Sequence, residues 1–404
     1  MRVASHIDAE RVELVSNAAP GDTAVSGPGD AQPYRASNTE IIEPAKPNEQ
    51  TSGSRELLSS ALQPGADRLI LLPYDAATDF EPAILRQPPI AHETNFPMVA
   101  QTLGSASALQ SPRSFHVGLL ESKWGRAGFL AGVETVLRHI AAGDVYQVNL
   151  SHRLAAPFNG DASAFARNLT RSASPEFGGF ACFEHKGVRH AVISLSPELF
   201  LRYNAQSRVV ETKPMKGTRP LANDPSELRD AEKDRAELNM IVDLMRNDLG
   251  RVADPGTVRV TRTRDIDPHA QSVWQATATV EAKLSDRHSP AELLACCFPP
   301  GSVTGAPKVR AAQIIRELEP HTRGPYCGSL VRVQRDGSFT ASVLIRTAHI
   351  VGTPDPSNPH SFLDAQLRFS VGAGIVADSN PAAEWEETMT KASVLTSVLQ
   401  NPST

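Results

Sequence analysis

The sequence feature that most constrains the fold is the segment SLVRVQRDGSFTASVLIRTAHIV, residues 329–351, which encodes an antiparallel hairpin. Apolar residues alternate on both sides of Asp336-Gly337, and Asp-Gly is a strong signal for a tight hairpin turn. HAVISLSPELFLRY, residues 190–203, reads as a strand interrupted by Ser-Pro-Glu, and residues 126–141 have the apolar periodicity of an amphipathic helix. Because these elements alternate without βαβ spacing, we predict one large α+β domain of mainly antiparallel sheets.

The N-terminal part of the chain differs in composition from the rest. Residues 17–54 are rich in Pro, Gly, Ser, Asn and Asp, which is typical of a linker or a weakly ordered region. We therefore divide the 404-residue chain into a low-complexity, weakly ordered segment at 1–60, a part of uncertain structure at 61–113 and a large globular domain at 114–404. No internal repeat of fixed period is visible.

Charge and hydropathy argue against several classes of function. The net charge of -5 at pH 7 provides neither a basic field for nucleic acid nor a polybasic patch for a membrane surface. No apolar run approaches the roughly 20 residues of a membrane helix, and the first residues lack the apolar core of a secretory signal. Four irregularly spaced cysteines do not suggest a disulfide framework or a CxxC zinc site. We therefore expect a cytoplasmic protein that binds neither nucleic acid nor membrane.

The stretch ETKPMKGTRP, residues 211–220, carries three cations, Lys213, Lys216 and Arg219. It reads as the end of a strand followed by a Gly-Thr turn, so the lysine before the glycine has a defined place in the fold. From these residues alone Lys216 is a solvated loop charge, a clamp for an anion or a nucleophile.

A second informative segment is FPPGSVTGAPKVRAAQIIRELEP, residues 298–320, in which a glycine-rich turn leads into an amphipathic helix. Proline at the first helical turn and the free N–H groups there, with Thr304 and Lys308 beside them, would suit an anion. The spacing is not that of a nucleotide-binding P-loop. An ordinary capped helix explains the segment equally well.

A carboxylate pair is encoded near the C-terminus, in NPAAEWEETMTKASVL, residues 380–395. Helical spacing puts Glu384, Glu387 and Lys391 on one face. These residues are either a solvated face that also suits the helix dipole, or a pair of ligands for a hard cation such as Mg²⁺.

Charged residues also occur beside or within apolar segments. Glu237 borders the apolar face of the helix predicted for residues 234–249, where a third metal carboxylate, a cap or an ion pair with Arg246 would each explain it. Arg346 lies inside the apolar strand segment LIRTAHI. Because a buried cation is costly unless paired, Arg346 is a candidate for binding a carboxylate.

Two glycine-rich segments would let a ligand approach the backbone. In RGPYCGSL, Tyr326 lies between glycines, where its OH could reach a ligand, although a core tyrosine is the simpler interpretation. VGAGIV, residues 371–376, ends a predicted strand in the small residues Gly372, Ala373 and Gly374. It is too short to be a dinucleotide-binding motif.

Taken together, these segments resemble the chorismate-utilising enzymes, which include anthranilate, aminodeoxychorismate, isochorismate and salicylate synthases. The matching motifs, in family order, are GDVYQVNLS, SLSPELF, PMKGTRP, RAELNMIVDLMRNDLGRV, PPGSVTGAPK, RGPYCGSL, LIRTA, VGAGIV and EWEETMTKA. The resemblance implies that residues 114–404 form a chorismate-binding catalytic domain of two packed, mainly antiparallel sheets flanked by helices. It also implies a deep cleft that holds chorismate and Mg²⁺.

The same resemblance implies roles for individual residues. Glu237 and Glu387, with Glu384 as helper, would be the Mg²⁺ ligands, and the metal would assist loss of a hydroxyl from the ring. The carboxylates of chorismate would be held by cations, hydroxyls and backbone groups of Gly217, Thr218, Thr304, Tyr326, Arg346, Gly372, Ala373, Gly374 and Lys391.

Lys216 distinguishes between members of the family. Anthranilate and salicylate synthases usually have alanine before this Gly-Thr, whereas aminodeoxychorismate synthases have a lysine that acts as a nucleophile on C2 of chorismate. The resemblance therefore implies a component I transferase that adds an amino group to chorismate for 4-aminobenzoate and folate synthesis. Glu198 would be the general acid for the leaving hydroxyl and needs a raised pKa, while Lys213 or Arg219 would favour a neutral amine at Lys216.

Two glutamines stand where other members of the family usually have a different residue. Gln147 stands where members that add water at C2 have a lysine base, which argues against isochorismate or salicylate chemistry. Gln275 stands where members usually have a histidine, and glutamine cannot carry a proton at pH 7. The alternatives are anthranilate synthase component I and a catalytically silent chorismate-binding subunit.

The expected reaction needs a source of ammonia. A glutaminase requires an activated cysteine on a Gly-x-Cys-x-Gly turn, and none of Cys182, Cys296, Cys297 and Cys327 has that setting. We therefore expect a separate glutamine amidotransferase subunit as partner. Because no lyase domain follows in the sequence, a separate aminodeoxychorismate lyase would release 4-aminobenzoate.

Overall fold

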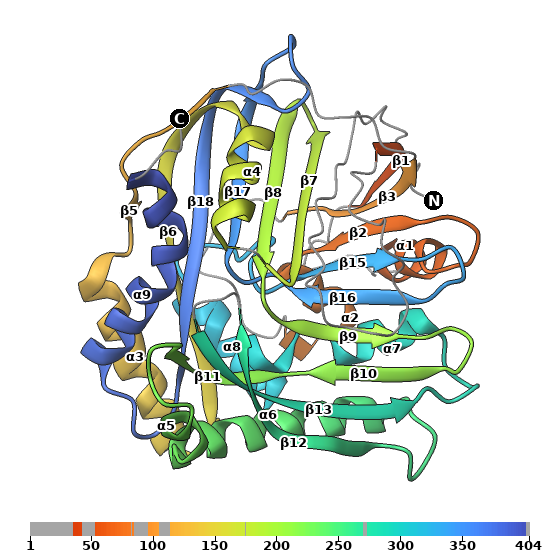
Figure 1. Ribbon diagram of the computed structural model, residues 1–404, viewed down its shortest axis with the longest axis vertical. Coiled ribbons are helices and arrows are strands. Elements are labelled where there is room, and N and C mark those ends of the chain that lie inside the picture. Colours follow the sequence, from red (N-terminus) through yellow and green to blue (C-terminus); the bar gives the residue numbers. More distant parts are fainter. Residues whose placement is uncertain are drawn as a thin grey trace.

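The computed structural model shows two antiparallel sheets packed together and flanked by helices (Figure 1). It describes residues 35–42, 53–81, 83–84, 96–104, 114–173, 175–269 and 273–400. Most of the segment predicted to be weakly ordered, residues 1–60, lies outside this set. None of the described helices is long and apolar enough to cross a membrane. The predicted α+β class with mainly antiparallel sheets is confirmed.

The first sheet joins the first three described strands to strands from the middle and later parts of the chain. Ten described strands form it, in the order β1-β3-β2-β15-β16-β9-β10-β13-β11, with β12 also pairing with β13. Their bounds are β1 Arg35–Ile42, β2 Arg68–Leu72, β3 Met98–Gly104, β9 Leu199–Tyr203, β10 Val209–Lys213, β11 Met215–Pro220, β12 Arg259–His269, β13 Val273–Lys283, β15 Ser329–Val333 and β16 Phe339–Val343. The segment of uncertain structure, residues 61–113, thus adds β2, which pairs with β15, and β3, which pairs with β2.

The second sheet is centred on two long strands, β6 and β18. Eight described strands form it, in the order β14-β6-β18-β17-β8-β7, with β4 and β5 also pairing with β6. Their bounds are β4 Phe115–Val117, β5 Glu121–Ser122, β6 Gln147–Asp161, β7 Phe177–His185, β8 Val188–Ser196, β14 Gly305–Ala306, β17 Thr347–Pro354 and β18 Ser361–Ile375. The β6–β18 pairing aligns Gly372 and Gly374 with Ser151 and Asn149.

Helices cover the outer surfaces and fill the junction between the sheets. Their bounds are α1 Gly53–Ala61, α2 Ala77–Phe80, α3 Gly125–Ala141, α4 Ala162–Ala173, α5 Ser226–Arg229, α6 Glu232–Gly250, α7 Pro290–Cys297, α8 Lys308–Leu318 and α9 Pro381–Gln400, with short 3-10 turns η1 Tyr74–Ala76 and η3 Gly301–Val303. In Figure 1, α3 and α9 lie side by side next to β18. Buried side chains such as Phe165 of α4, Phe369 of β18 and Leu395 of α9 form the core beneath these helices.

The main core lies where the two sheets meet. It combines Val148 and Leu150 of β6 with Ala276 and Ala278 of β13, and α6 adds Ile241. Burying this apolar surface between the sheets is the main force that holds them together.

The interruption predicted at Ser-Pro-Glu is the point where the chain passes from one sheet to the other. β8 pairs with β7 and β17 in the second sheet, whereas β9 pairs with β10 and β16 in the first. The corner is held by Ser196, whose Oγ donates to the Val343 carbonyl at 2.5 Å and accepts the Glu198 N–H at 3.2 Å. Glu198 is therefore fixed at the junction of the two sheets.

Candidate active site

Lys216 of β11 lies at a point where four elements meet. Its Nζ is 3.4 Å from Glu237 Oε2 of α6, and both side chains are only 16% exposed. A Cβ placed on Gly374 of β18 would lie 2.9 Å from Lys216 Nζ and 2.4 Å from Gln147 Nε2 of β6. Only a glycine at 374 leaves room for these two side chains to meet.

The charged partner of Lys216 differs from the expectation. Lys213 and Arg219 were expected to supply a cationic neighbourhood, but the structure puts the carboxylate of Glu237 beside the amine. Arg219 is paired with Asp234 at 2.9 Å, so its charge is balanced elsewhere. Arg246, the ion-pair partner considered for Glu237, is instead paired with Asp243.

Gly217 sets the direction of β11 after the lysine. Its φ is +85°, a region that favours glycine, and a Cβ there would lie 2.6 Å from Leu228 Cδ1 and 3.0 Å from Asp234 Cγ. The absence of a side chain therefore lets β11 pack directly against α5 and α6, which keeps Lys216 close to Glu237.

Glu198 is a buried acid with a strongly perturbed protonation equilibrium. Glu198 is only 4% exposed, and Ser302 of η3 donates a hydrogen bond from its hydroxyl to Glu198 Oε1 at 2.5 Å. Burial raises the pKa of Glu198 to about 7, although the Ser302 hydrogen bond and the Lys216 charge both lower it. Near neutral pH this carboxyl can therefore hold a proton.

Glu387 of α9 also interacts with the charge of Lys216. Lys391 Nζ contacts Glu387 Oε1 at 2.7 Å, so the predicted common face exists. Burial raises the pKa of Glu384, and the nearby charge of Glu387 raises it further. Burial acts on Glu387 in the same direction, but the ammonium groups of Lys391 and Lys216 outweigh it and lower the pKa of Glu387.

The three candidate metal carboxylates have the right donor chemistry for a hard divalent cation. Among the described residues, no group of three or more His, Cys, Asp or Glu side chains is already gathered around one point. Glu237 and Glu387 face Lys216 instead. Yet Glu384 is buried beside the negative charge of the more exposed Glu387, an arrangement that a bound cation would stabilise, so this donor set fits Mg²⁺.

Several candidates for substrate binding surround the same strand end. Tyr326 is buried, and its OH would be 2.9 Å from a Cβ placed on Gly372, while Lys391 Nζ donates to the Gly372 carbonyl at 2.8 Å. Arg346 links β16 to β17 with φ +49°, and burial lowers the pKa of its guanidinium. Within the part of the chain that the structure describes, Arg346 makes no ion pair, which suits an anionic ligand.

Three other candidates have different surroundings. The fully buried Thr304 donates its hydroxyl to the Pro300 carbonyl at 2.9 Å, which stabilises the loop before α8. Thr218 is exposed on β11, opposite Gln275 of β13. Ala373 is fully buried within the β6–β18 pairing, so only its backbone could meet a ligand.

Two residues of the cluster were not among the candidates from the sequence. Ser302 lies in PPGSVTG, the motif from which only Thr304 was selected, and its partner Glu198 is 104 positions away. The Gln147 side chain is fully buried, and neither of its two polar atoms has a hydrogen-bond partner within the described residues. A buried, unpartnered amide beside Lys216 suggests a contact with a ligand, a feature that only the tertiary structure reveals.

Comparison with known proteins agrees with this arrangement. A family model described as chorismate binding enzyme matches residues 72–397. The chain is 41% identical over 267 residues to aminodeoxychorismate synthase component 1 of Salmonella typhimurium, covering 64% of this chain and 55% of the relative. It is also 41% identical over 280 residues to anthranilate synthase component 1 of Streptomyces coelicolor, covering 67% of this chain and 51% of the relative.

The fold is shared with solved structures. Anthranilate synthase component I of Streptococcus pneumoniae superposes with a TM-score of 0.66 at 22% identity, covering 97% of this chain and 93% of that one. At this identity the likeness concerns the fold alone. The chain spans little more than half the length of the two relatives matched by sequence.

Proposed function

The chain belongs to the chorismate-binding enzyme family, and from this premise we propose that it is an aminodeoxychorismate synthase component I. The enzyme transfers an amino group from ammonia to chorismate and forms 4-amino-4-deoxychorismate. The proposal is supported by 41% identity to the component of that name in Salmonella typhimurium.

The observation that carries the proposal is the pairing of a lysine amine with a protonatable carboxyl in one buried cluster. The charge of Lys216 acts on Glu198, and the pKa of Glu198 is about 7. A nucleophile and a general acid that share a site can add to one end of a conjugated ring while protonating a leaving group at the other.

We propose that the reaction proceeds in two displacements. The neutral amine of Lys216 adds to C2 of chorismate, both conjugated double bonds of the ring shift, and the C4 hydroxyl leaves as water with the proton from Glu198. Ammonia then adds to C4, both double bonds shift back, and the C2–N bond to Lys216 breaks. Gln147, whose buried amide adjoins Lys216 and Gly374, lies where it can orient the attacking amine.

The other residues of the cluster bind and orient the dianionic substrate. Arg346 and Lys391 supply positive charge, and the Tyr326 hydroxyl and the backbone of Gly372 to Gly374 complete the binding surface. Glu237, Glu384 and Glu387 would hold Mg²⁺, whose bound charge supplies Lewis-acid stabilisation of the leaving oxygen and the substrate carboxylate.

The proposed reaction implies two further proteins. The relatives are named component 1, which suggests a second component, and we propose that a glutamine amidotransferase delivers the ammonia. A separate lyase would convert the product to 4-aminobenzoate.

The test is turnover of chorismate by the purified chain with Mg²⁺ and ammonium chloride, followed by addition of an aminodeoxychorismate lyase. We expect 4-aminobenzoate to appear only after the lyase is added, and Lys216→Ala to lower the rate at least about a hundredfold. Formation of 4-aminobenzoate at an unchanged rate by Lys216→Ala would remove the nucleophile from the mechanism.

Anthranilate synthase is the second candidate, because an anthranilate synthase component 1 is equally similar at 41% identity. The same assay separates the two functions, since anthranilate fluoresces and forms without a lyase. Chorismate binding without any product would instead indicate a silent binding subunit.

A further inference from the structure

Strand β6 carries a second buried amide on the face that meets Lys216. Alternate residues of a strand point to the same face, so the side chain of Asn149 shares its face with that of Gln147, two positions earlier. Val148, between them, points to the opposite face and belongs to the main hydrophobic core. Asn149 is only 7% exposed. It is therefore a buried polar residue next to the amide that adjoins the lysine.

The pairing of β6 with β18 fixes how far Asn149 lies from the lysine amine. Asn149 is aligned with Gly374, and directly opposite residues of antiparallel strands have Cβ atoms about 4.5 to 5.5 Å apart. A Cβ built on Gly374 would lie 2.9 Å from Lys216 Nζ. Because the glycine has no side chain, a ligand that contacts Lys216 over Gly374 also comes within reach of the Asn149 amide.

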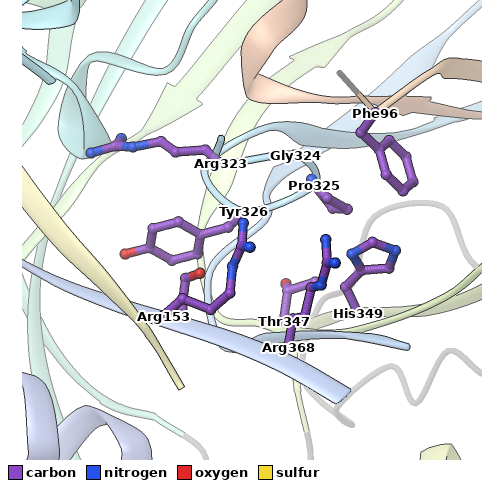
Figure 2. A pocket seen from close by; sticks show the side chains of 10 residues that line it. Phe96, Arg153, Arg323, Gly324, Pro325, Tyr326, Thr347, His349 and Arg368 are labelled. Carbon is purple, nitrogen blue, oxygen red and sulfur yellow. The ribbon is translucent and has the colours of Figure 1, made fainter. Parts of the chain in front are cut away.

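The backbone of Asn149 is held on both sides, whereas its side chain is not. Its N–H donates to the Thr304 carbonyl at 2.9 Å, and its carbonyl accepts a hydrogen bond from Arg323 Nη2 at 2.6 Å. Arg323 and Tyr326 extend from one turn in the same direction, away from Phe96, so the turn that fixes Asn149 also carries a candidate for substrate binding (Figure 2). Within the part of the chain that the structure describes, Asn149 Nδ2 is buried and has no hydrogen-bond partner. A rigid backbone thus presents an unpaired donor.

Asn358, a buried asparagine between β17 and β18, illustrates the usual environment of such an amide. Its Nδ2 donates to Asp161 Oδ2 at 3.1 Å and to Ser361 Oγ at 2.5 Å, and its Oδ1 accepts the His360 N–H at 3.1 Å. Buried polar groups in native proteins are paired in this way as a rule, because an unpaired one costs free energy. The unpaired donor of Asn149, beside the candidate nucleophile, therefore indicates a hydrogen bond that forms with a ligand.

We propose that Asn149 is a substrate-binding residue, whose Nδ2 donates a hydrogen bond to an oxygen of the chorismate substituents next to C2. The inference rests on the proposed function for the identity of the substrate. The contact holds C2 of the ring within reach of the Lys216 amine, which restricts the orientation of the two reacting groups. Binding also pairs an amide that is unpaired in the free enzyme, so part of the binding energy comes from removing that cost.

The affinity of Asn149→Leu for chorismate tests the contact. Leucine is similar in shape to asparagine but has no polar atom in its side chain. Titration calorimetry of the whole chain with chorismate and Mg²⁺, without ammonia so that amination cannot proceed, measures the Kd. We expect the Kd of the variant to be about tenfold or more above that of the unmodified protein. An unchanged Kd would overturn the proposal.

Melting temperatures without chorismate separate this role from a structural one. Because Asn149→Leu removes an amide that has no partner in the free protein, its melting temperature should equal or exceed that of the unmodified chain. Asn358→Leu is the matched control, since it removes an amide with three hydrogen bonds. It should lower the melting temperature by about 3 °C or more and leave the Kd for chorismate unchanged. An equal fall in Asn149→Leu, together with an unchanged Kd, would identify a structural amide and contradict the contact.

A second variant decides the matter if Asn149→Leu does not fold. Asn149→Ala removes the amide without adding bulk and should show the same rise in Kd, and retained affinity would overturn the contact. The product formed by the unmodified chain is a separate readout. Anthranilate in place of 4-amino-4-deoxychorismate would overturn the proposed function, whereas a tenfold rise in the Kd of the variants would still support the contact between Asn149 and chorismate.

Discussion

At the scale of single residues, opposing forces determine the protonation of Glu198. Burial removes the carboxyl from water and raises its pKa, while the hydrogen bond from Ser302 and the charge of Lys216 favour the ionised form. The balance leaves the pKa at about 7, so the proposed general acid is half protonated near neutral pH. Activity that requires the protonated form should therefore decline as the pH rises through about 7.

Ser302→Ala tests this balance. Removing the hydroxyl withdraws a hydrogen bond that stabilises the carboxylate, so the pKa of Glu198 should rise and the alkaline limb of the kcat profile should move to higher pH. The profile is measured with saturating chorismate and ammonia. Ser342→Ala, which removes a buried hydroxyl bonded to the Leu330 carbonyl, is the control and should leave the limb in place. An alkaline limb that stays fixed in Ser302→Ala would exclude Glu198 as its source.

At the scale of elements, the position of β11 depends on Gly217. This glycine combines a positive φ with close contact to α5, whereas Gly187 in the β7–β8 turn has a similar φ of +77° and open space around it, with no atom within 4 Å of a Cβ added there. Gly187→Ala should therefore cost only the backbone strain of about 1 kcal/mol. Gly217→Ala should cost about 1 to 3 kcal/mol more, because its methyl group would overlap Leu228 Cδ1.

Urea unfolding of both glycine variants measures these costs. We also expect Gly217→Ala to lower kcat, since a displaced β11 moves Lys216 away from the cluster, while Gly187→Ala keeps the activity. Equal losses of stability in the two variants would mean that β11 tolerates a side chain at residue 217.

The acids of α9 give a second prediction at this scale. Glu387→Gln keeps the size of the side chain but removes a carboxylate that faces Lys391 and Lys216. We expect the Mg²⁺ concentration for half-maximal activity to rise at least about tenfold. Glu386→Gln, at the exposed neighbouring position, should leave the Mg²⁺ titration unchanged. A normal titration in Glu387→Gln would mean that this acid is only a surface partner of Lys391.

Elements with local signals could be predicted from the sequence, and tertiary partners could not. The Asp336-Gly337 turn and the helix at residues 126–141 are encoded by neighbouring residues, and both occur in the structure, the helix as α3. The pairing of Glu237 with Lys216 depends on how α6 packs against β11, which no spacing in the sequence specifies. The same holds for Ser302, since its distance from Glu198 along the chain hides the contact.

At the scale of the whole molecule, His152 joins parts of the chain that are far apart in sequence. It lies on β6 in the second sheet, its Nε2 is 2.9 Å from Thr388 Oγ1 of α9, and its ring stacks on Trp385 at 4.6 Å between centroids. Phe129 of α3 covers another edge of the ring. The C-terminal helix, the first long helix and the central strand thus share one buried imidazole.

This shared imidazole makes the stability of the whole fold sensitive to acid. Burial lowers the pKa of His152 from 6.5 to about 4, and the neighbouring His321 adds to the effect. Between those two pH values the unfolded chain binds a proton that the folded chain does not. The free energy of unfolding should therefore fall as the pH falls from about 6.5 to about 4, by about 1.4 kcal/mol per pH unit for this histidine.

His152→Gln removes the titrating group while its amide can still donate to Thr388. The slope of the unfolding free energy against pH is measured by urea denaturation between pH 6.5 and 4.5. We expect this slope to decrease by about 1.4 kcal/mol per pH unit, the contribution of one bound proton, even if the variant is less stable overall. His116→Gln, at the exposed position of β4, is the matched control and should retain the slope of the unmodified protein. Carboxylates that titrate in this range contribute equally to all three proteins, so the difference between slopes isolates the histidine. If His152→Gln keeps the full slope, acid sensitivity arises elsewhere, and the contact between β6 and α9 does not depend on a neutral imidazole.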